Sequence, residues 1–277
     1  MKQLFVSAIL ILFALSASAV QLPASDPVAG GIVHLPLDLD SDTPPQVTYG
    51  KHRVMVVSSD NSDYQQQGRW LALIGIPLST KTGPQTVKIN GQPLSFEIEA
   101  KQYKEQHLTI KNKRKVNPNP LDMKRINREK KEILAALASW TETAQPVTQL
   151  LKPTQGPYSS PFGLRRFFNE QPRNPHSGLD IAAAKGTSII APATGKVVAT
   201  GDYFFNGRTV ILDHGHGLTT MYCHMNRIDV ELGQSISVGQ QLGTVGATGR
   251  VTGPHLHWGV SLNNARINPI LMMTPTK

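Results

Sequence analysis

The chain has 277 residues, of which 39% are hydrophobic and 17% charged. This is enough apolar material for one large domain or two modest ones, and it argues against a disordered chain. The 23 glycines and 20 prolines follow no period and aromatic residues make up 6%, which excludes a collagen-like repeat or a coiled coil and favours short strands with many turns. The single cysteine cannot close an intrachain disulfide.

The first nineteen residues have the form of a cleaved signal peptide. Lys2 supplies a positive charge, residues 4–15 are almost entirely apolar, and Ala17-Ser18-Ala19 is the small-x-small pattern that signal peptidases accept. The alternative is a membrane anchor, but the apolar run is shorter than the ~20 residues needed to cross a bilayer. With no lipobox cysteine to carry a lipid, we expect residues 1–19 to be removed and the mature protein to be soluble in the periplasm or secreted.

The formal charge of +9 is unevenly distributed. Residues 101–132 carry 11 basic and 4 acidic side chains, and residues 151–277 carry 11 and 6. Basic segments of this kind suit an anionic polymer, which for an exported protein means a cell wall or a phospholipid surface rather than nucleic acid. We therefore expect no nucleic-acid partner.

Residues 20–111 predict a small antiparallel β-sandwich. Short β-branched or aromatic runs alternate with turns that contain proline or glycine. Asn90-Gly91 is typical of a two-residue hairpin turn, because both positions accept a positive φ. His34, His52 and His107 lie far apart without partners and are interpreted as structural or solvated. The expected strands are residues 32–37, 47–49, 53–58, 70–76 and 94–103.

Residues 112–139 predict one basic amphipathic helix of about five turns. Asn119 supplies an N-cap and Pro120 suits the first turn. Its charged face could contact an anionic membrane surface or could simply be solvated. Residues 140–157 contain three prolines and a glycine and predict a linker. The apolar positions of the helix are Leu121, Ile126, Ile133, Leu134 and Leu137.

Residues 158–277 predict a compact all-β domain that carries the chemistry. The segment holds 15 of the 23 glycines and six of the nine histidines, and it alternates short apolar strands with glycine turns. No phosphate-binding glycine loop of the Walker or Rossmann type is present. The candidate site residues are therefore the histidines and the carboxylates near them.

Two motifs bring such residues close together. His176 and Asp180 are four residues apart in a loop that leads into a strand. They are either metal ligands or a hydrogen-bonded pair that stabilises the loop. The side chains of His255 and His257 lie on the same face of an extended strand. They are either metal ligands or two surface histidines. One carboxylate with several imidazoles fits a zinc site that has three protein ligands and an open position.

A third motif, Tyr222-Cys223-His224-Met225, ends an apolar strand. Strand alternation places Cys223 and His224 on opposite faces, which disfavours a Cys–His nucleophilic pair. Cys223 is interpreted as a core residue, and His224 can join the face of the other histidines. No H-E-x-x-H occurs, so histidines that do not bind the metal must act as the general base. His214 and His216 are interpreted as turn residues.

These motifs, in this order, resemble the signatures of the lysostaphin-type (LytM-like) zinc endopeptidases. The resemblance covers residues 158–277 and departs at Cys223, where an alanine or glycine is expected. It implies one Zn²⁺ ion per chain. The implied metal ligands are His176, Asp180 and His257, and the implied catalytic residues are His224 and His255.

The resemblance also implies hydrolysis of peptide cross-links in peptidoglycan. The bond that we expect to be cut is the one between D-alanine and diaminopimelate. The segment before residue 140 resembles, more loosely, the N-terminal region that precedes such domains in some Gram-negative proteins. Glycine bridges or a non-wall protein are alternative substrates. Another function is a non-hydrolytic wall-binding activator of a separate peptidoglycan amidase, and an active enzyme could itself need a regulatory protein partner. A further hypothesis makes the first domain an inhibitory prosegment that covers the groove through residues 140–157.

Overall fold

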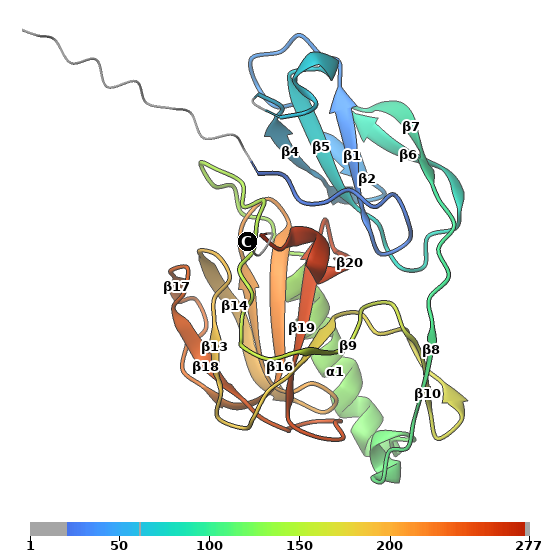
Figure 1. Ribbon diagram of the computed structural model, residues 1–277, viewed down its shortest axis with the longest axis vertical. Coiled ribbons are helices and arrows are strands. Elements are labelled where there is room, and N and C mark those ends of the chain that lie inside the picture. Colours follow the sequence, from blue (N-terminus) through green and yellow to red (C-terminus); the bar gives the residue numbers. More distant parts are fainter. Residues whose placement is uncertain (1–20, 61, 275–277) are drawn as a thin grey trace, which may run out of the picture.

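The computed structural model describes residues 21–60 and 62–274 (Figure 1). The expected signal peptide, residues 1–19, lies outside the described residues. Short strands make up most of the regular structure and one α-helix is present in the described part of the chain, which confirms the predicted fold class. Within these residues, no helix is long and apolar enough to cross a membrane.

The N-terminal part is a sandwich of two antiparallel sheets around the side chains of Val33, Ile74, Val87 and Phe96, among others. The β6–β7 turn is formed by Asn90 and Gly91, with φ angles of 49° and 88°, so the predicted hairpin is confirmed. One sheet has the order β1 (Ile32–Leu37), β5 (Trp70–Gly75), β4 (Met55–Ser58), and the other β3 (His52–Arg53), β2 (Val47–Tyr49), β6 (Gly83–Ile89), β7 (Gln92–Ile98).

The sandwich and the C-terminal part share a continuous core. On the side of the β1-β5-β4 sheet that faces away from the sandwich interior, Leu71 and Leu73 belong to the same buried cluster as Trp258 and Leu262. The side chain of Asn263 also clamps the backbone of β5, accepting from the Gly75 amide at 2.6 Å and donating to its carbonyl at 2.9 Å. The two parts therefore pack as one body, with the sandwich above the large sheet in Figure 1.

The C-terminal part is built on a ten-stranded sheet whose main path runs β17-β14-β15-β16-β19-β12-β9. Strands β13 and β18 pair with each other, β18 also pairs with β16, and β20 pairs with β19. The strand bounds are β9 (Tyr158–Ser160), β12 (Leu179–Ala182), β13 (Ser188–Ile190), β14 (Gly195–Tyr203), β15 (Gly207–Asp213), β16 (Leu218–Ile228), β17 (Ser235–Ile236), β18 (Gln241–Val245), β19 (His255–Leu262) and β20 (Ala265–Ile267).

A third small sheet joins the N-terminal segment to the C-terminal part. Strand β8 (Glu105–Leu108) pairs in parallel with β10 (Arg165–Phe168), which pairs in turn with β11 (Gln171–Pro172). The strand expected at 94–103 ends at Ile98, and the chain then runs down beside the C-terminal part as β8 (Figure 1). The sequence pattern did not indicate this parallel pairing.

The predicted helix is α1 (Pro120–Leu137), and its cap is confirmed because the Asn119 side chain accepts from the Asp122 amide at 2.9 Å. The predicted apolar face is wrong in part: Leu121 is 78% exposed and Leu134 48%. The helix packs on β14 and β15 through Ala136 and Leu137 at its C-terminal end.

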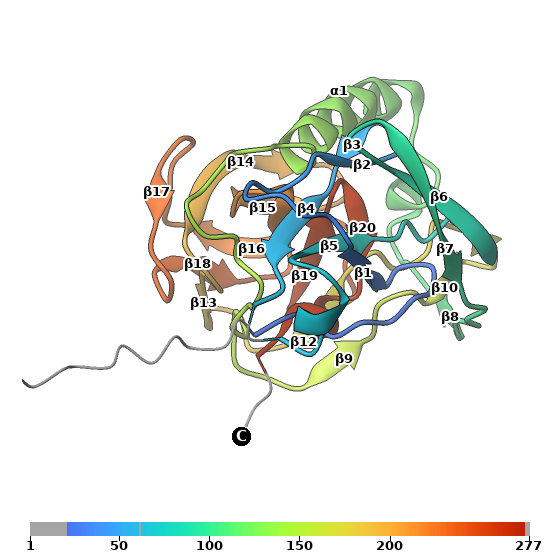
Figure 2. The same cartoon turned by 90° about the horizontal axis from the view of Figure 1, so that it is seen from above.

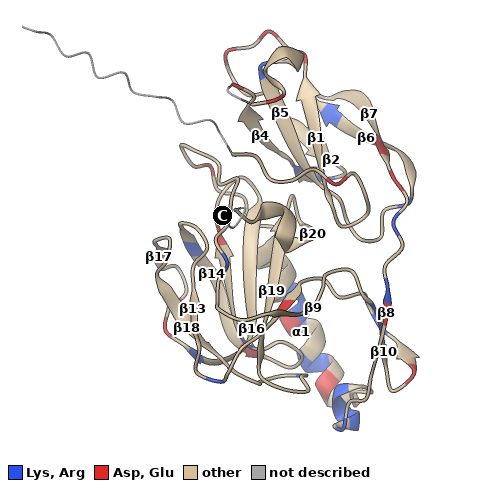
Figure 3. Ribbon diagram, in the orientation of Figure 1, with Lys and Arg blue, Asp and Glu red and all other residues tan. Residues whose placement is uncertain are grey.

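Buried acidic groups hold the first half of α1 where apolar side chains were expected. Glu129 accepts from the Phe204 amide at 2.7 Å and pairs with Arg125 on its own helix, while Asp122 pairs with Arg114. Figure 2 shows α1 along one side of the large sheet, and Figure 3 shows basic residues gathered at its N-terminal end. The side chains that remain exposed on the helix include Lys124, Arg128, Lys130 and Lys131.

The segment predicted as a linker, residues 140–157, is fixed along the C-terminal part. The Thr141 hydroxyl donates to Asp213 at 2.7 Å, and the Thr143 amide donates to His216 at 3.2 Å. Leu150 is fully buried and bridges to Met273.

Replacing the helix cap should lower stability without changing the core. Asn119→Ala removes the acceptor of the Asp122 amide and should lower the free energy of unfolding by about 1 kcal/mol, measured by urea denaturation. The matched control is Asn127→Ala at an exposed position inside α1, which should be neutral or slightly stabilising because alanine has the higher helix propensity. Equal losses in the two variants would contradict the capping role.

Candidate metal centre

Two antiparallel strands set the positions of the central side chains. In the pairing of β12 with β19, Asp180 lies opposite His257 and Ala182 lies opposite His255. Because directly opposed residues share a face of the sheet, Asp180, His255 and His257 all project to one side. The prediction that the two histidines share a face is confirmed. His176 precedes β12 in a loop and is buried.

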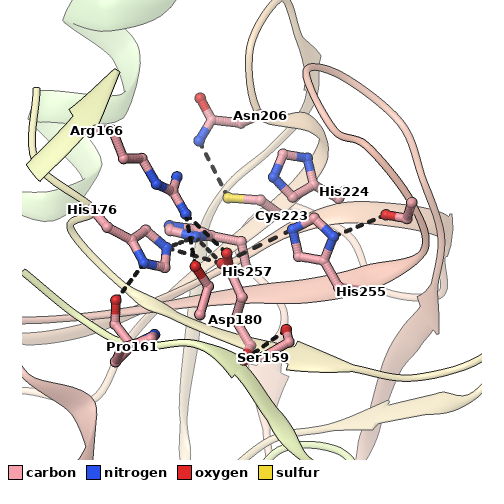
Figure 4. A network of polar contacts seen from close by, with 12 residues as sticks. Ser159, Pro161, Arg166, His176, Asp180, Asn206, Cys223, His224, His255 and His257 are labelled. Carbon is pink, nitrogen blue, oxygen red and sulfur yellow. Dashed lines mark hydrogen bonds and ion pairs between the residues drawn. The ribbon is translucent and has the colours of Figure 1, made fainter. Parts of the chain in front are cut away.

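Three potential ligand atoms from these elements converge on one point (Figure 4). His176 Nε2 lies 2.9 Å from Asp180 Oδ1 and 3.0 Å from His257 Nδ1, and His257 Nδ1 lies 2.8 Å from the same carboxylate oxygen. In such a triangle the centre is roughly 1.7 Å from each corner, inside the ~2.0–2.2 Å that separate Zn²⁺ from nitrogen and oxygen ligands. One divalent ion can therefore contact all three atoms.

The hydrogen bonds of His176 also suit a metal. Its Nδ1 donates to the Pro161 carbonyl at 2.7 Å, so a neutral ring carries its lone pair on Nε2 and directs it at the Asp180 oxygen. Two electron-rich atoms in contact are stabilised by a cation between them. A ligand histidine that donates its other nitrogen to a backbone carbonyl is the usual arrangement in protein metal sites.

The second carboxylate oxygen of Asp180 is held by an arginine. Arg166 donates to Oδ2 at 3.0 Å and to the side-chain amide oxygen Oε1 of Gln106, on β8, at 3.0 Å, and the Gln106 side-chain nitrogen in turn donates to the Ser160 hydroxyl. This leaves Oδ1 to face the two histidines. Burial alone would raise the pKa of Asp180, but the close approach of the His176 and His257 rings outweighs it and holds the pKa below its usual range.

His224 and His255 lie beside the three-atom cluster without joining it. Their ring centroids are 4.9 Å apart, and the His224 ring is 6.0 Å from that of His257. His224 Nδ1 donates to the Thr248 carbonyl at 2.8 Å and His255 Nδ1 to the Gly253 carbonyl at 2.9 Å. Each neutral ring therefore keeps a free lone pair on Nε2. Burial, reinforced by the neighbouring histidines, lowers the pKa of His224 well below its usual value, so His224 is neutral near pH 7.

The backbone at His224 breaks the strand pattern. Cys223 lies directly opposite His257, so both point to the same face of the sheet. His224 adopts the left-handed conformation, with φ of 63°, and its ring turns to that same side. The prediction that Cys223 and His224 occupy opposite faces is therefore wrong, because a local backbone reversal overrides alternation.

Cys223 is nevertheless a core residue, as expected. Its side chain is fully buried with Ala136 and Leu137 of α1. The Asn206 side chain donates to its sulfur at 3.3 Å, and burial raises the pKa of the thiol to about 11. A thiolate nucleophile is excluded at this position under ordinary conditions.

A cavity of about 260 Å³ adjoins the three-atom cluster, and His176 is buried behind its wall. Asp180, His224, His255 and His257 line the cavity directly. Its walls come from the β8 segment, through Gln106, Leu108 and Ile110, and from residues 250–254. No described residue of 140–157 lines this cavity, so the part of the N-terminal region next to the site is β8 and its continuation. Whether the first domain inhibits the site stays a prediction.

The remaining histidines lie elsewhere. His214 is buried, donating from Nδ1 to the Thr194 carbonyl at 2.7 Å with its other nitrogen on Thr220. His34 contacts Tyr64, and His107 contacts Glu170. Sequence reasoning assigned no role to Gln106, Arg166 or Arg250, and for Gln106 no local signal existed because its place depends on the β8–β10 pairing.

The fold and the site define a β-rich metallopeptidase with a two-sheet N-terminal domain. The family model described as "Peptidase family M23" matches residues 174–269, and "Peptidase family M23 N-terminal domain" matches residues 25–101. A crystal structure from Pseudomonas aeruginosa assigned to peptidase M23 is 42% identical, with a TM-score of 0.73, and the match covers 90% of this chain and 96% of that chain. The chain belongs to peptidase family M23, which confirms the resemblance seen in the sequence.

Curated relatives match the C-terminal part. The peptidoglycan DD-endopeptidase ShyA of Vibrio cholerae is 38% identical over 118 residues, which are 42% of this chain and 27% of that protein. The DD-carboxypeptidase/endopeptidase Mpg of Neisseria meningitidis serogroup B is 36% identical over 118 residues, which are 43% of this chain and 27% of that protein. The matched region thus spans about a quarter of each relative's length.

Loss of one ligand atom should abolish metal binding. His257→Ala removes one corner of the triangle and should leave purified protein without stoichiometric metal when Zn²⁺ is supplied, measured by elemental analysis. His255→Ala is the matched control, because its ring lies beside the cluster without completing it, and should retain one ion per chain. A His257→Ala protein that binds zinc as the unmodified chain does would refute the ligand set.

The arginine behind Asp180 should matter for metal affinity. Arg166→Gln removes the donor that orients the carboxylate and should weaken zinc binding by about 10- to 100-fold, measured by competition with a chromogenic chelator. Its neighbour Arg165 pairs with Glu105 on the surface and is 61% exposed, so Arg165→Gln should leave the affinity unchanged. Equal affinities for the two variants would remove Arg166 from the site.

Proposed function

We propose that the protein is a zinc endopeptidase that hydrolyses peptide cross-links of peptidoglycan in the periplasm, at the bond between D-alanine and diaminopimelate. The observation that carries this proposal is a His/Asp/His triangle at the wall of one cavity, beside two further histidines with free lone pairs. Relatives named for DD-endopeptidase activity support the substrate class. The signal-like residues 1–19 support export to the compartment that holds this polymer.

The donor set fits Zn²⁺ better than a harder ion. Two imidazoles and one carboxylate are typical of catalytic zinc sites, which keep a fourth position open. A Zn²⁺ ion held by His176, Asp180 and His257 would supply Lewis acidity that polarises the scissile carbonyl and makes water a stronger acid.

The chain's own residues then handle the proton. Nε2 of His224 or His255 accepts a proton from the attacking water, since both rings are fixed with Nδ1 protonated. The protonated ring donates a hydrogen bond to the developing oxyanion and returns the proton to the leaving amine. Asp180, with its charge shared between Arg166 and the ligand histidines, keeps the metal ligands in place during these steps.

Digestion of purified sacculi tests the proposal. The zinc-loaded protein should convert cross-linked muropeptide dimers to monomers, detected by mass spectrometry. His224→Ala and His255→Ala should each lower the rate by about 10²-fold or more while zinc stays bound, because proton transfer by a positioned side chain contributes on that scale. Asn127→Ala is the control and should digest at the unmodified rate.

The same experiment separates the alternative functions. A protein that binds zinc and sacculi, leaves the cross-linked dimers intact and stimulates an added amidase would be an activator, and the endopeptidase assignment would fail. Cleavage of glycine bridges in place of D-alanyl bonds would keep the enzyme class and change the substrate.

A further inference from the structure

Arg250 brings a positive charge into the groove at the metal centre. It lines the 260 Å³ cavity that holds Asp180 and His257, and it also lines an adjoining cavity of about 320 Å³. The two cavities share Ile110, Val251 and Thr252 as well, so they adjoin each other at Arg250.

The guanidinium of Arg250 is held in a fixed position by aromatic rings. It lies 4.2 Å from the ring centroid of Phe205 and 4.6 Å from that of Phe168. Its backbone amide donates to the Phe205 carbonyl at 2.9 Å, and Nη1 donates to the Lys115 carbonyl at 3.3 Å. Stacking on ring faces leaves the edge of a guanidinium free for in-plane hydrogen bonds, and only one side-chain donor of Arg250 has a hydrogen-bond partner in the described part of the chain.

No carboxylate neutralises this charge within residues 21–60 and 62–274. Among the described residues that line the two cavities, Asp180 is the sole acid, and it is already paired with Arg166 and the ligand histidines. Burial, together with the nearby Arg166 and Arg173, lowers the pKa of Arg250 to about 10, so the group remains a cation at neutral pH. Lys111 and Lys115 add two more cations to the adjoining cavity.

A partly buried cation without a counter-charge is costly unless a bound anion completes the site. A guanidinium with a free edge binds carboxylates through two parallel hydrogen bonds. We propose that Arg250 is a substrate-binding residue that pairs with a free carboxylate of the peptide in the groove. This inference rests on the proposed function and narrows its substrates to acidic peptides.

The proposed substrate offers such groups from two sources. At a cross-link to diaminopimelate, a free carboxylate is attached to the same carbon as the scissile nitrogen, and the C-terminal carboxylate of an uncross-linked D-alanyl-D-alanine end occupies the equivalent place. The second source is the α-carboxylate of the D-glutamate earlier in the stem. Both are carboxylates, and amidation of each in turn distinguishes them.

The test measures binding of fluorescent stem pentapeptides by anisotropy. The peptides carry lysine at the third position and so have two carboxylates; they are the parent with both carboxylates free, its C-terminal amide, and its D-isoglutamine form. The protein is the zinc-loaded full chain carrying His224→Ala to prevent turnover, with Arg250 unchanged or replaced. Zinc content and melting temperature are recorded for each variant to verify folding.

We expect one of the two amidations to weaken binding at least about tenfold, the scale of a hydrogen bond to a charged group. The Arg250→Gln variant should bind the parent peptide more weakly by a similar factor. It should also bind the parent and the amidated peptide that showed the loss with equal affinity. Arg250→Lys keeps the charge without the fork and should lie between. Arg165→Gln is the control and should bind like the protein with Arg250.

The inference is overturned if the Arg250→Gln variant binds the parent peptide as tightly as the protein with Arg250 does. It is also overturned if the substitution weakens the binding of all three peptides by the same factor, or if no peptide binds. The two proposals fail separately. If the unmodified enzyme digests sacculi but peptide binding does not depend on a carboxylate, only the role of Arg250 fails. If peptide binding depends on a carboxylate and Arg250 but no cross-link is cleaved, only the endopeptidase function fails.

Discussion

The pairing of Asp180 with His257 across β12 and β19 is the constraint on which the site depends. Their antiparallel register puts a carboxylate and an imidazole face to face at 2.8 Å. A buried carboxylate is tolerated only with compensating partners, and removal of one partner from a buried charged pair typically costs about 3–5 kcal/mol. Here the compensation comes from two histidines on one oxygen and Arg166 on the other.

The same constraint explains why the N-terminal region is part of the site. Arg166 belongs to β10, and β10 is paired with β8, which supplies Gln106 to the other side of the guanidinium. A chain of hydrogen bonds therefore runs from the segment before α1 to the Asp180 carboxylate. The shared core below the sandwich and the Asn263 clamp on Gly75 hold this segment in register with the large sheet.

The sequence was informative where local chemistry decides the structure. Asn90-Gly91 requires two positive φ angles, and Asn119 followed by proline specifies a helix start, so both features could be predicted. The i, i+2 spacing of His255 and His257 fixes a shared face in any extended strand. These three features need no knowledge of the tertiary structure.

The sequence was uninformative where contacts between distant segments of the chain determine the structure. No sequence signal indicates the left-handed backbone conformation of His224. The prediction that Cys223 and His224 lie on opposite faces of the strand is wrong for this reason. Leu121 and Leu134 fit a helical apolar stripe but face water, because α1 is anchored by Glu129 to the Phe204 amide and by Ala136 and Leu137 at its C-terminal end. The roles of Gln106 and Arg250 depend on elements that meet only after folding.

The β8 wall limits how modular this peptidase is. The residues that resemble metal ligands all lie after residue 175, so a gene segment encoding the C-terminal part alone carries the complete ligand set. Such a fragment would lose Gln106, Leu108 and Ile110, and with them one side of the groove. Exchange of N-terminal regions between relatives would therefore reshape one wall of the groove and replace the contact that holds Arg166 against Asp180, while all three candidate ligands stayed in place.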